Sequence, residues 1–171
     1  MDKLTPEQRH KCMARIRSKN TRPEMIVRRY LFANGYRYRI HVKSLPGTPD
    51  IVIPSLHTVI FVNGCFWHGH EGCPNFVLPK SNVDFWHKKI ERNRNRDHKE
   101  RLQLRDLGWH VIVVWECQLM SKVRSDNLRS LLHTLNTIYL QNKKIKIYDF
   151  DFAEEERLVA AEEEKDGYLE D

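Results

Sequence analysis

The chain has 171 residues, of which 40% are hydrophobic and 30% are charged. This length accommodates one domain with a hydrophobic core, and no apolar run is long enough to span a membrane. The polar first residues predict no secretory signal peptide, and the four cysteines favour a reducing cytoplasm over a disulfide framework.

The formal net charge of +6 is unevenly distributed along the chain. Residues 1–150 carry 27 Lys and Arg against 13 Asp and Glu, whereas residues 151–171 carry 2 against 10. A body this basic predicts a polyanionic partner, and nucleic acid is the first candidate. The acidic end predicts either a solvated helix or a disordered tail.

Two helix-start signals lie near the N-terminus. Thr5-Pro6-Glu7-Gln8 predicts a basic helix over about residues 5–17. Thr21-Arg22-Pro23-Glu24 repeats the signal, and Asn34-Gly35 is a typical left-handed stop for the second helix.

The rest of the chain alternates strand and helix patterns. Residues 36–42 alternate with a period of two, which predicts a strand with its tyrosines and aliphatic side chains facing inward. Further elements are predicted as strands over 50–53 and 59–62, a long basic helix from 81 to about 106, a strand over 109–115, a helix over about 125–140 and a strand over 145–148. The almost wholly apolar run 109–115 fits a central buried strand. This order of elements predicts an α/β fold.

A short loop carries the pattern of a metal site. Cys65, His70 and Cys73 have the spacing of a zinc-ligand loop. Cys117, far downstream, can complete a tetrahedral set of three thiolates and one imidazole. The sequence therefore predicts a zinc ion at this loop.

The same loop also carries side chains that the metal does not need. His68 is left over, and Phe66 and Trp67 lie between the ligands. A ligand loop would hold the two rings rigid and partly exposed, which favours contact with a partner molecule. The alternative is a structural zinc knuckle whose aromatic side chains belong to the core.

A second metal site is predicted from carboxylates. Asp50 follows Pro49 at the start of a strand, and Glu24 is available from the second helix. Pro-Asp entering a strand, with another acid nearby, resembles the metal-binding half of restriction-endonuclease-like nucleases, and such a pocket suits Mg²⁺. Pro-Asp is also a common turn pair, and Glu24 already closes a capping box. The Glu-x-Lys that these nucleases usually carry on the next strand is missing from residues 60–64.

Five segments in this order resemble the very-short-patch-repair (Vsr) mismatch endonucleases. They are Pro46–Asp50, Phe61–His70, Phe85–Ile90, Leu107–Trp109 and Val114–Cys117. The resemblance implies a restriction-endonuclease-like fold with a central mixed β-sheet, flanking helices, a structural zinc site and an N-terminal helical arm. It also implies an enzyme that nicks duplex DNA on the 5′ side of the thymine in a T·G mismatch, which arises when 5-methylcytosine deaminates.

The resemblance implies a role for each candidate residue. Asp50 would bind Mg²⁺ together with the backbone carbonyl of Val62, which would explain the missing Glu-x-Lys. His68 would activate the attacking water, with Glu24 as a supporting acid. The zinc ligands would be Cys65, His70, Cys73 and Cys117, and the wedge that enters the base stack would be Met13, Phe66 and Trp67.

Contacts with the bases around the mismatch are assigned to the predicted basic helix. The DNA-binding candidates are Trp86, Lys88, Lys89, Arg92 and Asn93, and a solvated helix face is the alternative for its charged residues. Two positions depart from the family pattern. Asn63 stands where some relatives carry His, which puts auxiliary acid–base help from this position in doubt, and Gly72 adds one residue to the zinc loop.

The predicted organisation has three parts: a DNA-contacting arm (1–20), an endonuclease domain (21–150) with its zinc loop (62–73), and an acidic tail (151–171). The expected partner is double-stranded DNA with a T·G mismatch, bound by a monomer in the bacterial cytoplasm and at the nucleoid when it acts. A mismatch-repair protein is a further candidate partner. Two other functions remain open: a restriction-like nuclease that cuts unmismatched DNA, and a zinc-stabilised DNA-binding module without catalysis.

Overall fold

The computed structural model describes residues 5–14 and 19–143. The elements are α1 (Pro6–Ala14), α2 (Arg22–Ala33), β1 (Ile51–Ile53), the 3₁₀ turn η1 (Pro54–Leu56), β2 (Thr58–Asn63), α3 (Val83–Asp106), β3 (His110–Trp115), η2 (Glu116–Leu119) and α4 (Arg124–Asn142). The end of the first predicted helix, the predicted strand at 145–148 and the acidic tail lie outside the described residues. The described residues up to Tyr139 belong to one compact unit.

The strands form a mixed sheet with the order β1-β2-β3. β1 and β2 are antiparallel, with Ile51 opposite Ile60, and β2 and β3 are parallel, with Val62 opposite Val114. Parallel neighbours need a long crossover, and α3 supplies it. The predicted α/β class and the mixed sheet flanked by helices are confirmed.

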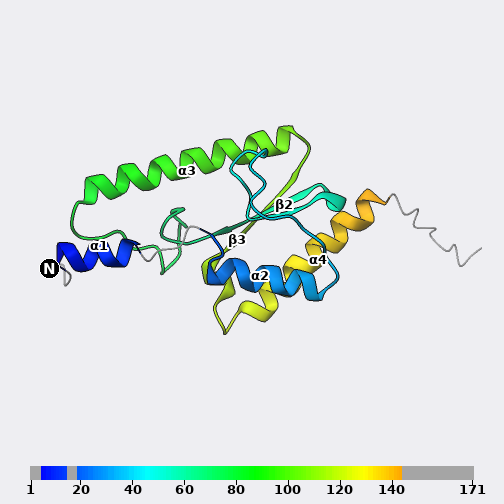
Figure 1. Cartoon of the computed structure of the whole chain (residues 1–171), viewed down its shortest axis with the longest axis horizontal. Helices are drawn as coiled ribbons and strands as arrows, with labels where there is room; N and C mark the ends of the chain where they lie inside the picture. Colours follow the sequence, from blue (N-terminus) through cyan, green and yellow to red (C-terminus); the bar gives the residue numbers. More distant parts are fainter. Residues whose placement is uncertain (1–4, 15–18, 144–171) are drawn as a thin grey trace, which may run out of the picture. The chain divides into compact units, whose positions relative to one another are not determined.

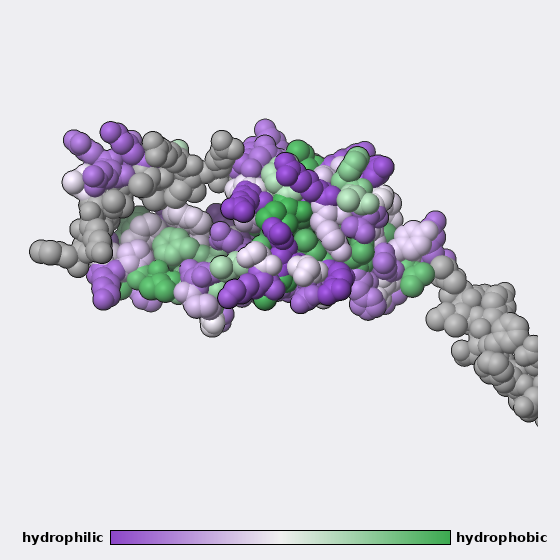
Figure 2. Space-filling model, turned by 90° about the horizontal axis from the view of Figure 1, so that it is seen from below, coloured by the Kyte–Doolittle hydropathy of each residue, from purple (hydrophilic) through white to green (hydrophobic). Residues whose placement is uncertain are grey.

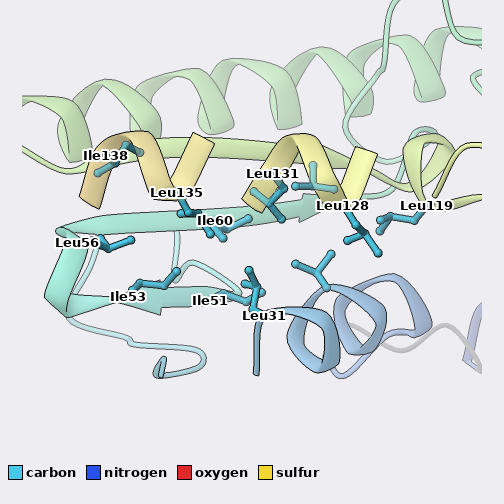
Figure 3. Close-up of a cluster of buried hydrophobic side chains, with 12 residues drawn as sticks. Leu31, Ile51, Ile53, Leu56, Ile60, Leu119, Leu128, Leu131, Leu135 and Ile138 are labelled. Carbon is cyan, nitrogen blue, oxygen red and sulfur yellow. The ribbon is translucent and has the colours of Figure 1, made fainter. Parts of the chain in front are cut away.

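Helices lie on both sides of the sheet, with α3 on one side and α2 and α4 on the other (Figure 1). Ile51 and Ile53 pack in the cluster that contains leucines of α2 and α4 (Figure 3). Val52, between them in the sequence, packs instead with Leu104 of α3. This alternation follows from strand geometry, and burying each such side chain contributes about 1.5–3 kcal/mol.

Local capping places the two N-terminal helices as predicted. At the start of α1, the Gln8 N–H donates to Thr5 Oγ1 at 3.2 Å, and the Thr5 N–H donates to Gln8 Oε1 at 3.0 Å. α2 begins with the reciprocal capping box of Thr21 and Glu24. It ends before Gly35, whose φ of 85° is a conformation that glycine adopts without steric cost.

The strand predicted over residues 36–42 is wrong. A single bridge joins Arg39 to Val52, with backbone hydrogen bonds of 2.8 Å in both directions. Two residues later, His41 has a left-handed backbone with a φ of 49°, which a continuing strand cannot contain. The pairing therefore stops after one residue pair.

The period-two pattern predicted only part of the side-chain directions in this segment. Tyr36 and Tyr38 pack against the core, and their hydroxyl groups donate to Asn136 Oδ1 at 2.6 Å and to the Arg28 carbonyl at 3.1 Å. Ile40, which the pattern also turns inward, is 46% exposed. The inward prediction holds for the tyrosines and fails for this aliphatic residue.

β3 is not the central buried strand that its apolar sequence predicted. In the described residues it pairs with β2 alone, and only Val114 in it is buried. β2 is the middle strand. An apolar run therefore indicated a strand correctly but did not indicate its place in the sheet, which depends on partners far away in the sequence.

Hydrophilic residues occupy much of the molecular face drawn in Figure 2. Figure 2 shows one face on which hydrophobic areas are separated by hydrophilic residues. None of the helices in the described part of the chain has the length and apolar character that crossing a membrane requires.

Candidate active site and metal centre

The four predicted zinc ligands meet just beyond the ends of β2 and β3. The ligand atoms of Cys65, His70, Cys73 and Cys117 all lie within 4.8 Å of one another. β2 leads directly into the loop, and β3 leads into the 3₁₀ turn η2 that carries Cys117. Because the two strands are parallel, their ends lie at the same edge of the sheet, and residues distant in sequence come together there.

The spacing of these atoms fits zinc. Nδ1 of His70 lies 3.5 Å from Sγ of both Cys65 and Cys117. A tetrahedral ion with Zn–S of about 2.3 Å and Zn–N of about 2.0 Å separates sulfur and nitrogen by about 3.5 Å. The His70 ring also stacks on Trp115, with centroids 4.0 Å apart and planes at 1°, which fixes its orientation.

Two of the three thiols, those of Cys65 and Cys117, would be easier to ionise beside a bound cation. Burial raises the pKa of Cys65 to about 12, and burial also raises the pKa of Cys117. Thiolates are the metal-binding form, so a dication is the natural compensation for crowding these groups together. The chemistry of the donors therefore favours a soft, thiolate-binding ion such as zinc.

The zinc-ligand loop is held against α3. Gly69 has a φ of 60°, and a Cβ there would lie 2.8 Å from side-chain atoms of Ile90 and Arg94. Only glycine allows this approach. Gly72, the additional loop residue, has a φ of 68° and open space around it, so it is accommodated as a left-handed turn.

Four aromatic rings form a cluster between this loop and the start of α3. Phe66 lies edge-on to Trp67 and to Trp86, with centroids 5.1 and 5.3 Å apart, and Phe85 adjoins Trp86 at 5.3 Å. None of the four belongs to either hydrophobic core cluster of the described residues, and Phe85 is 55% exposed. The rings are therefore not ordinary core. Met13 lies in α1, and its side chain is outside the described structure.

α3 contributes polar contacts to this aromatic cluster. Asn93 donates through Nδ2 to the Trp67 carbonyl at 3.0 Å, and Lys89 Nζ lies 5.9 Å from the Trp67 ring centroid. Lys88 and Arg92 lie on the exposed side of the helix. Of the five predicted DNA-binding residues, Trp86 thus belongs to the cluster, Lys89 and Asn93 border it, and Lys88 and Arg92 face solvent.

A cleft of about 880 Å³ gathers most of the remaining candidates. The predicted residues that line it are Glu24, Asp50, Val62, Trp67, His68 and Asn93. Its other lining residues, to which sequence reasoning had given no catalytic role, include His41, Asn63 and Asp97. Acidic, imidazole and aromatic groups therefore share one cavity.

Asp50 is a carboxylate that a cation would stabilise. It accepts a hydrogen bond from the Val62 N–H at 2.8 Å through Oδ2. Burial raises its pKa, and the charge of Glu24 raises it further, against opposing effects of the Val62 hydrogen bond, His41 and Arg28. A buried carboxylate of this kind is a suitable ligand for a hard divalent ion.

Glu24 is largely committed to other partners. It is 3% exposed, and its oxygens accept from the Thr21 N–H and hydroxyl, from the Asn20 N–H and from Arg28. The capping-box interpretation is therefore correct for this residue, and it also lies beside Asp50 in the cleft.

His68 is oriented by Asp97 of α3. Its Nδ1 lies 2.5 Å from Asp97 Oδ2, so the ring proton belongs on Nδ1 and Nε2 is left as an acceptor. Burial acts to raise the pKa of Asp97, but the hydrogen bonds from His68 and Arg96 outweigh it and lower the pKa. Asp97 thus stays ionised beside the imidazole.

Two of these residues were missed for different reasons. Asp97 lies seven residues from the buried Ile90 and seven from the buried Leu104, so helical spacing places a carboxylate on the inner face of α3, a signal the sequence did contain. His41 gave no signal, because its position depends on a left-handed backbone that no local motif announces.

Comparison with known proteins places the chain in a family. The family model for the DNA mismatch endonuclease Vsr matches residues 1–75. A type II nicking enzyme of Xanthomonas oryzae, V.XorIIP, is 57% identical over 69% of this chain and 86% of its own length. The nicking enzyme V.NmeAIP of Neisseria meningitidis is 48% identical over 71% and 86%, and the DNA mismatch endonuclease Vsr of Escherichia coli is 40% identical over 71% and 75%.

These similarities define the class of protein as a DNA endonuclease, a phosphodiester hydrolase. The chain belongs to the Vsr family of DNA mismatch endonucleases. The resemblance read from the five sequence segments is confirmed.

Proposed function

We propose that this protein nicks duplex DNA on the 5′ side of the thymine in a T·G mismatch left by deamination of 5-methylcytosine, with Mg²⁺ as the catalytic ion. The proposal includes a restriction-endonuclease-like fold and a structural zinc ion. The observation that carries it is the cleft in which Asp50, His68 and the wedge residue Trp67 lie together. Nicking activity is also what the names of several relatives state of those proteins.

The proposed chemistry needs four groups of the chain. Asp50 and the Val62 carbonyl would hold Mg²⁺, which would supply the charge that stabilises the attacked phosphate. Nε2 of His68 removes a proton from the attacking water, because Nδ1 is occupied by Asp97. Asp97 then stabilises the imidazolium that forms, since its lowered pKa keeps it ionised.

The proposed selectivity comes from the aromatic cluster. Inserting rings between base pairs costs a few kcal/mol of unstacking per step, and less where a mismatch has already weakened the stack. Phe66 and Trp67 would form the wedge, joined by Met13 from the N-terminal arm, and Trp86 supports both rings from α3. The basic face of α3 would add backbone contacts.

The test is a nicking assay on matched duplexes that differ only in T·G against T·A, with each strand labelled separately. We expect one Mg²⁺-dependent break in the thymine strand of the T·G duplex, 5′ to the mismatched thymine. Asp50→Ala should bind the T·G duplex but not nick it, with the zinc content of the wild type as a folding control. Breaks in both strands of the T·A duplex would support a restriction-like nuclease, and binding without breaks would support a non-catalytic module.

A further inference from the structure

A second group of potential metal ligands lies in the cleft. Ligand atoms of Glu24, His41 and Asp50 are within 4.8 Å of one another. Taken by themselves, two carboxylates and an imidazole would form a three-ligand cage for one divalent ion. Such a cage would leave few coordination positions for water and phosphate.

A buried arginine already occupies one side of this group. Arg28 has a side chain that is 5% exposed, and its Nη2 lies 2.8 Å from Glu24 Oε2 and 3.2 Å from His41 Nε2. The same nitrogen donates to the Asp50 carbonyl at 3.2 Å, and Nη1 donates to Asn20 Oδ1 at 2.6 Å. One guanidinium thus contacts all three members of the group.

These contacts leave little room for a metal ion between Glu24 and His41. An ion bound to both Oε2 and Nε2 would lie within a few ångströms of Arg28 Nη2, where two positive charges repel in a poorly solvated site. A guanidinium only donates hydrogen bonds, and the two hydrogens of Nη2 are shared among Glu24, His41 and the Asp50 carbonyl, so in its contact with Arg28 His41 Nε2 serves as an acceptor. Of the two carboxylates in the group, that of Glu24 is bonded to Arg28, whereas Asp50 contacts Arg28 through its backbone carbonyl and keeps its carboxylate for the ion.

The backbone of His41 indicates that this arrangement is imposed by the surrounding structure. Its φ of 49° is uncommon for a residue other than glycine, and it directs the ring to Arg28 instead of continuing the strand. Arg28 Nε is also a buried nitrogen without a hydrogen-bond partner in the described residues. Both features cost free energy, and such costs persist only where the surrounding contacts hold the residues in place.

We propose that the Arg28 guanidinium occupies the position that a metal ion would otherwise take between Glu24 and His41. It thereby keeps coordination positions of the catalytic ion open. The guanidinium withholds Glu24 and His41 from the ion, which is then held by Asp50 with positions free for water and phosphate. Arg28 is a positioning residue, because it acts through these neighbours. The inference rests on the proposed function, in which Asp50 binds the ion.

The experiment measures Mn²⁺ binding to the full zinc-loaded chain without DNA, by electron paramagnetic resonance, for wild type, Arg28→Met, Arg28→Lys and His41→Gln. Arg29→Met is the matched control, since Arg29 is the exposed neighbour on α2. We expect Arg28→Met to bind Mn²⁺ at least tenfold more tightly and to show a new imidazole nitrogen coupling. Arg28→Lys, which keeps the charge, and Arg29→Met should stay within about threefold of wild type.

The wild-type spectrum decides the matter even if Arg28→Met does not fold. Wild type and His41→Gln should give the same spectrum, since a glutamine carbonyl can accept from Arg28 and neither protein uses position 41 as a ligand. An imidazole coupling in wild type that disappears in His41→Gln would overturn the inference, as would folded Arg28→Met with unchanged or weaker affinity. The Mn²⁺ experiment has no nicking readout, so its result does not depend on whether the protein nicks the T·G duplex.

Discussion

At the residue scale, the catalytic imidazole of the proposal depends on a partner from another element. His68 comes from the zinc-ligand loop and Asp97 from α3, and the two meet at 2.5 Å. Removing the imidazole removes the base itself, whereas neutralising the carboxylate removes the orientation of the ring and the stabilisation of its charged form. Substituting His68 should therefore abolish general-base catalysis, whereas substituting Asp97 should weaken it and leave the imidazole in use.

We expect His68→Ala to slow single-turnover nicking of the T·G duplex by roughly 10²–10⁴, the usual range for a general base. Asp97→Asn should also slow it, but the remaining activity should still depend on the imidazole. The check is the double variant: His68→Ala/Asp97→Asn should be no slower than His68→Ala alone. Additive losses would show that Asp97 does not act through His68.

Asp50 illustrates a conflict between function and stability at one residue. Its pKa is raised in the folded protein, mainly by burial, so the folded state holds the proton more tightly than the unfolded state. At neutral pH the carboxylate is therefore unfavourable to folding, and this cost disappears as the pH falls through the folded-state pKa. Without divalent metal, Asp50→Asn should melt at a higher temperature than wild type at pH 7.

Calorimetry at a series of pH values checks the sign of this effect. The advantage of Asp50→Asn should shrink as the pH is lowered toward the raised pKa and should shrink also on adding Mg²⁺ to wild type. The same variant should not nick. A variant that melts below wild type at pH 7 would show that the Val62 hydrogen bond to the carboxylate outweighs its burial.

At the scale of elements, the zinc-ligand loop is a link between two parallel strands. Cys65 follows β2 and Cys117 follows β3, so one ion would join the ends of both strands. Cys117→Ser should lose zinc and melt far below wild type, because a structural zinc site contributes folding free energy directly. Metal analysis and melting temperature are measured together. Stoichiometric zinc in this variant would mean that the fourth ligand is another residue.

The aromatic cluster gives a second prediction at this scale. Trp67→Ala should weaken T·G binding by about 1–3 kcal/mol, the usual value of a base–aromatic stack, and affect the T·A duplex much less. A core tryptophan would instead cost about 3–5 kcal/mol of stability and weaken both duplexes together. The ratio of T·G to T·A affinity, compared with the melting temperature, separates these two outcomes.

Elements fixed by local chemistry were predictable from sequence, and those fixed by distant contacts were not. The capping box at Thr21 and Glu24 and the stop at Gly35 depend on neighbouring residues, and both were placed correctly. The strand over residues 36–42 failed because His41 turns toward Arg28, a partner on another element. The four Cys and His residues of the candidate metal site could be grouped by their spacing, whereas helical spacing could place Asp97 on the inner face of α3 but could not predict its contact with His68.

At the scale of the whole molecule, the uneven charge of the chain predicts an affinity for DNA that depends on salt. The first 150 residues carry a net charge of +14 in a chain whose total is +6. Affinity for duplex DNA should fall steeply with salt, because each phosphate contact releases a counterion. Replacing the exposed Lys88 by Ala should lower the slope of log affinity against log salt by about one, with an unchanged preference for T·G.

Titrations of both duplexes between low and physiological salt provide this measurement. Glu91→Ala is the matched control, because it is exposed on the same helix and carries the opposite charge. It should leave the slope unchanged or increase it. A change in the T·G to T·A ratio on replacing Lys88 would show that this side chain contacts bases and not only phosphates.

The docking of the zinc-ligand loop on α3 bears on the fidelity of the proposed reaction. Gly69 allows close contact with the helix, and Asn93 and Asp97 hold Trp67 and His68 from the same helix. Recognition and hydrolysis would therefore be performed by one rigid body, with no separate step between them. Since a genome offers about 10⁶–10⁹ competing sites, accidental damage to intact DNA would then be limited by how often a correct base pair opens by itself.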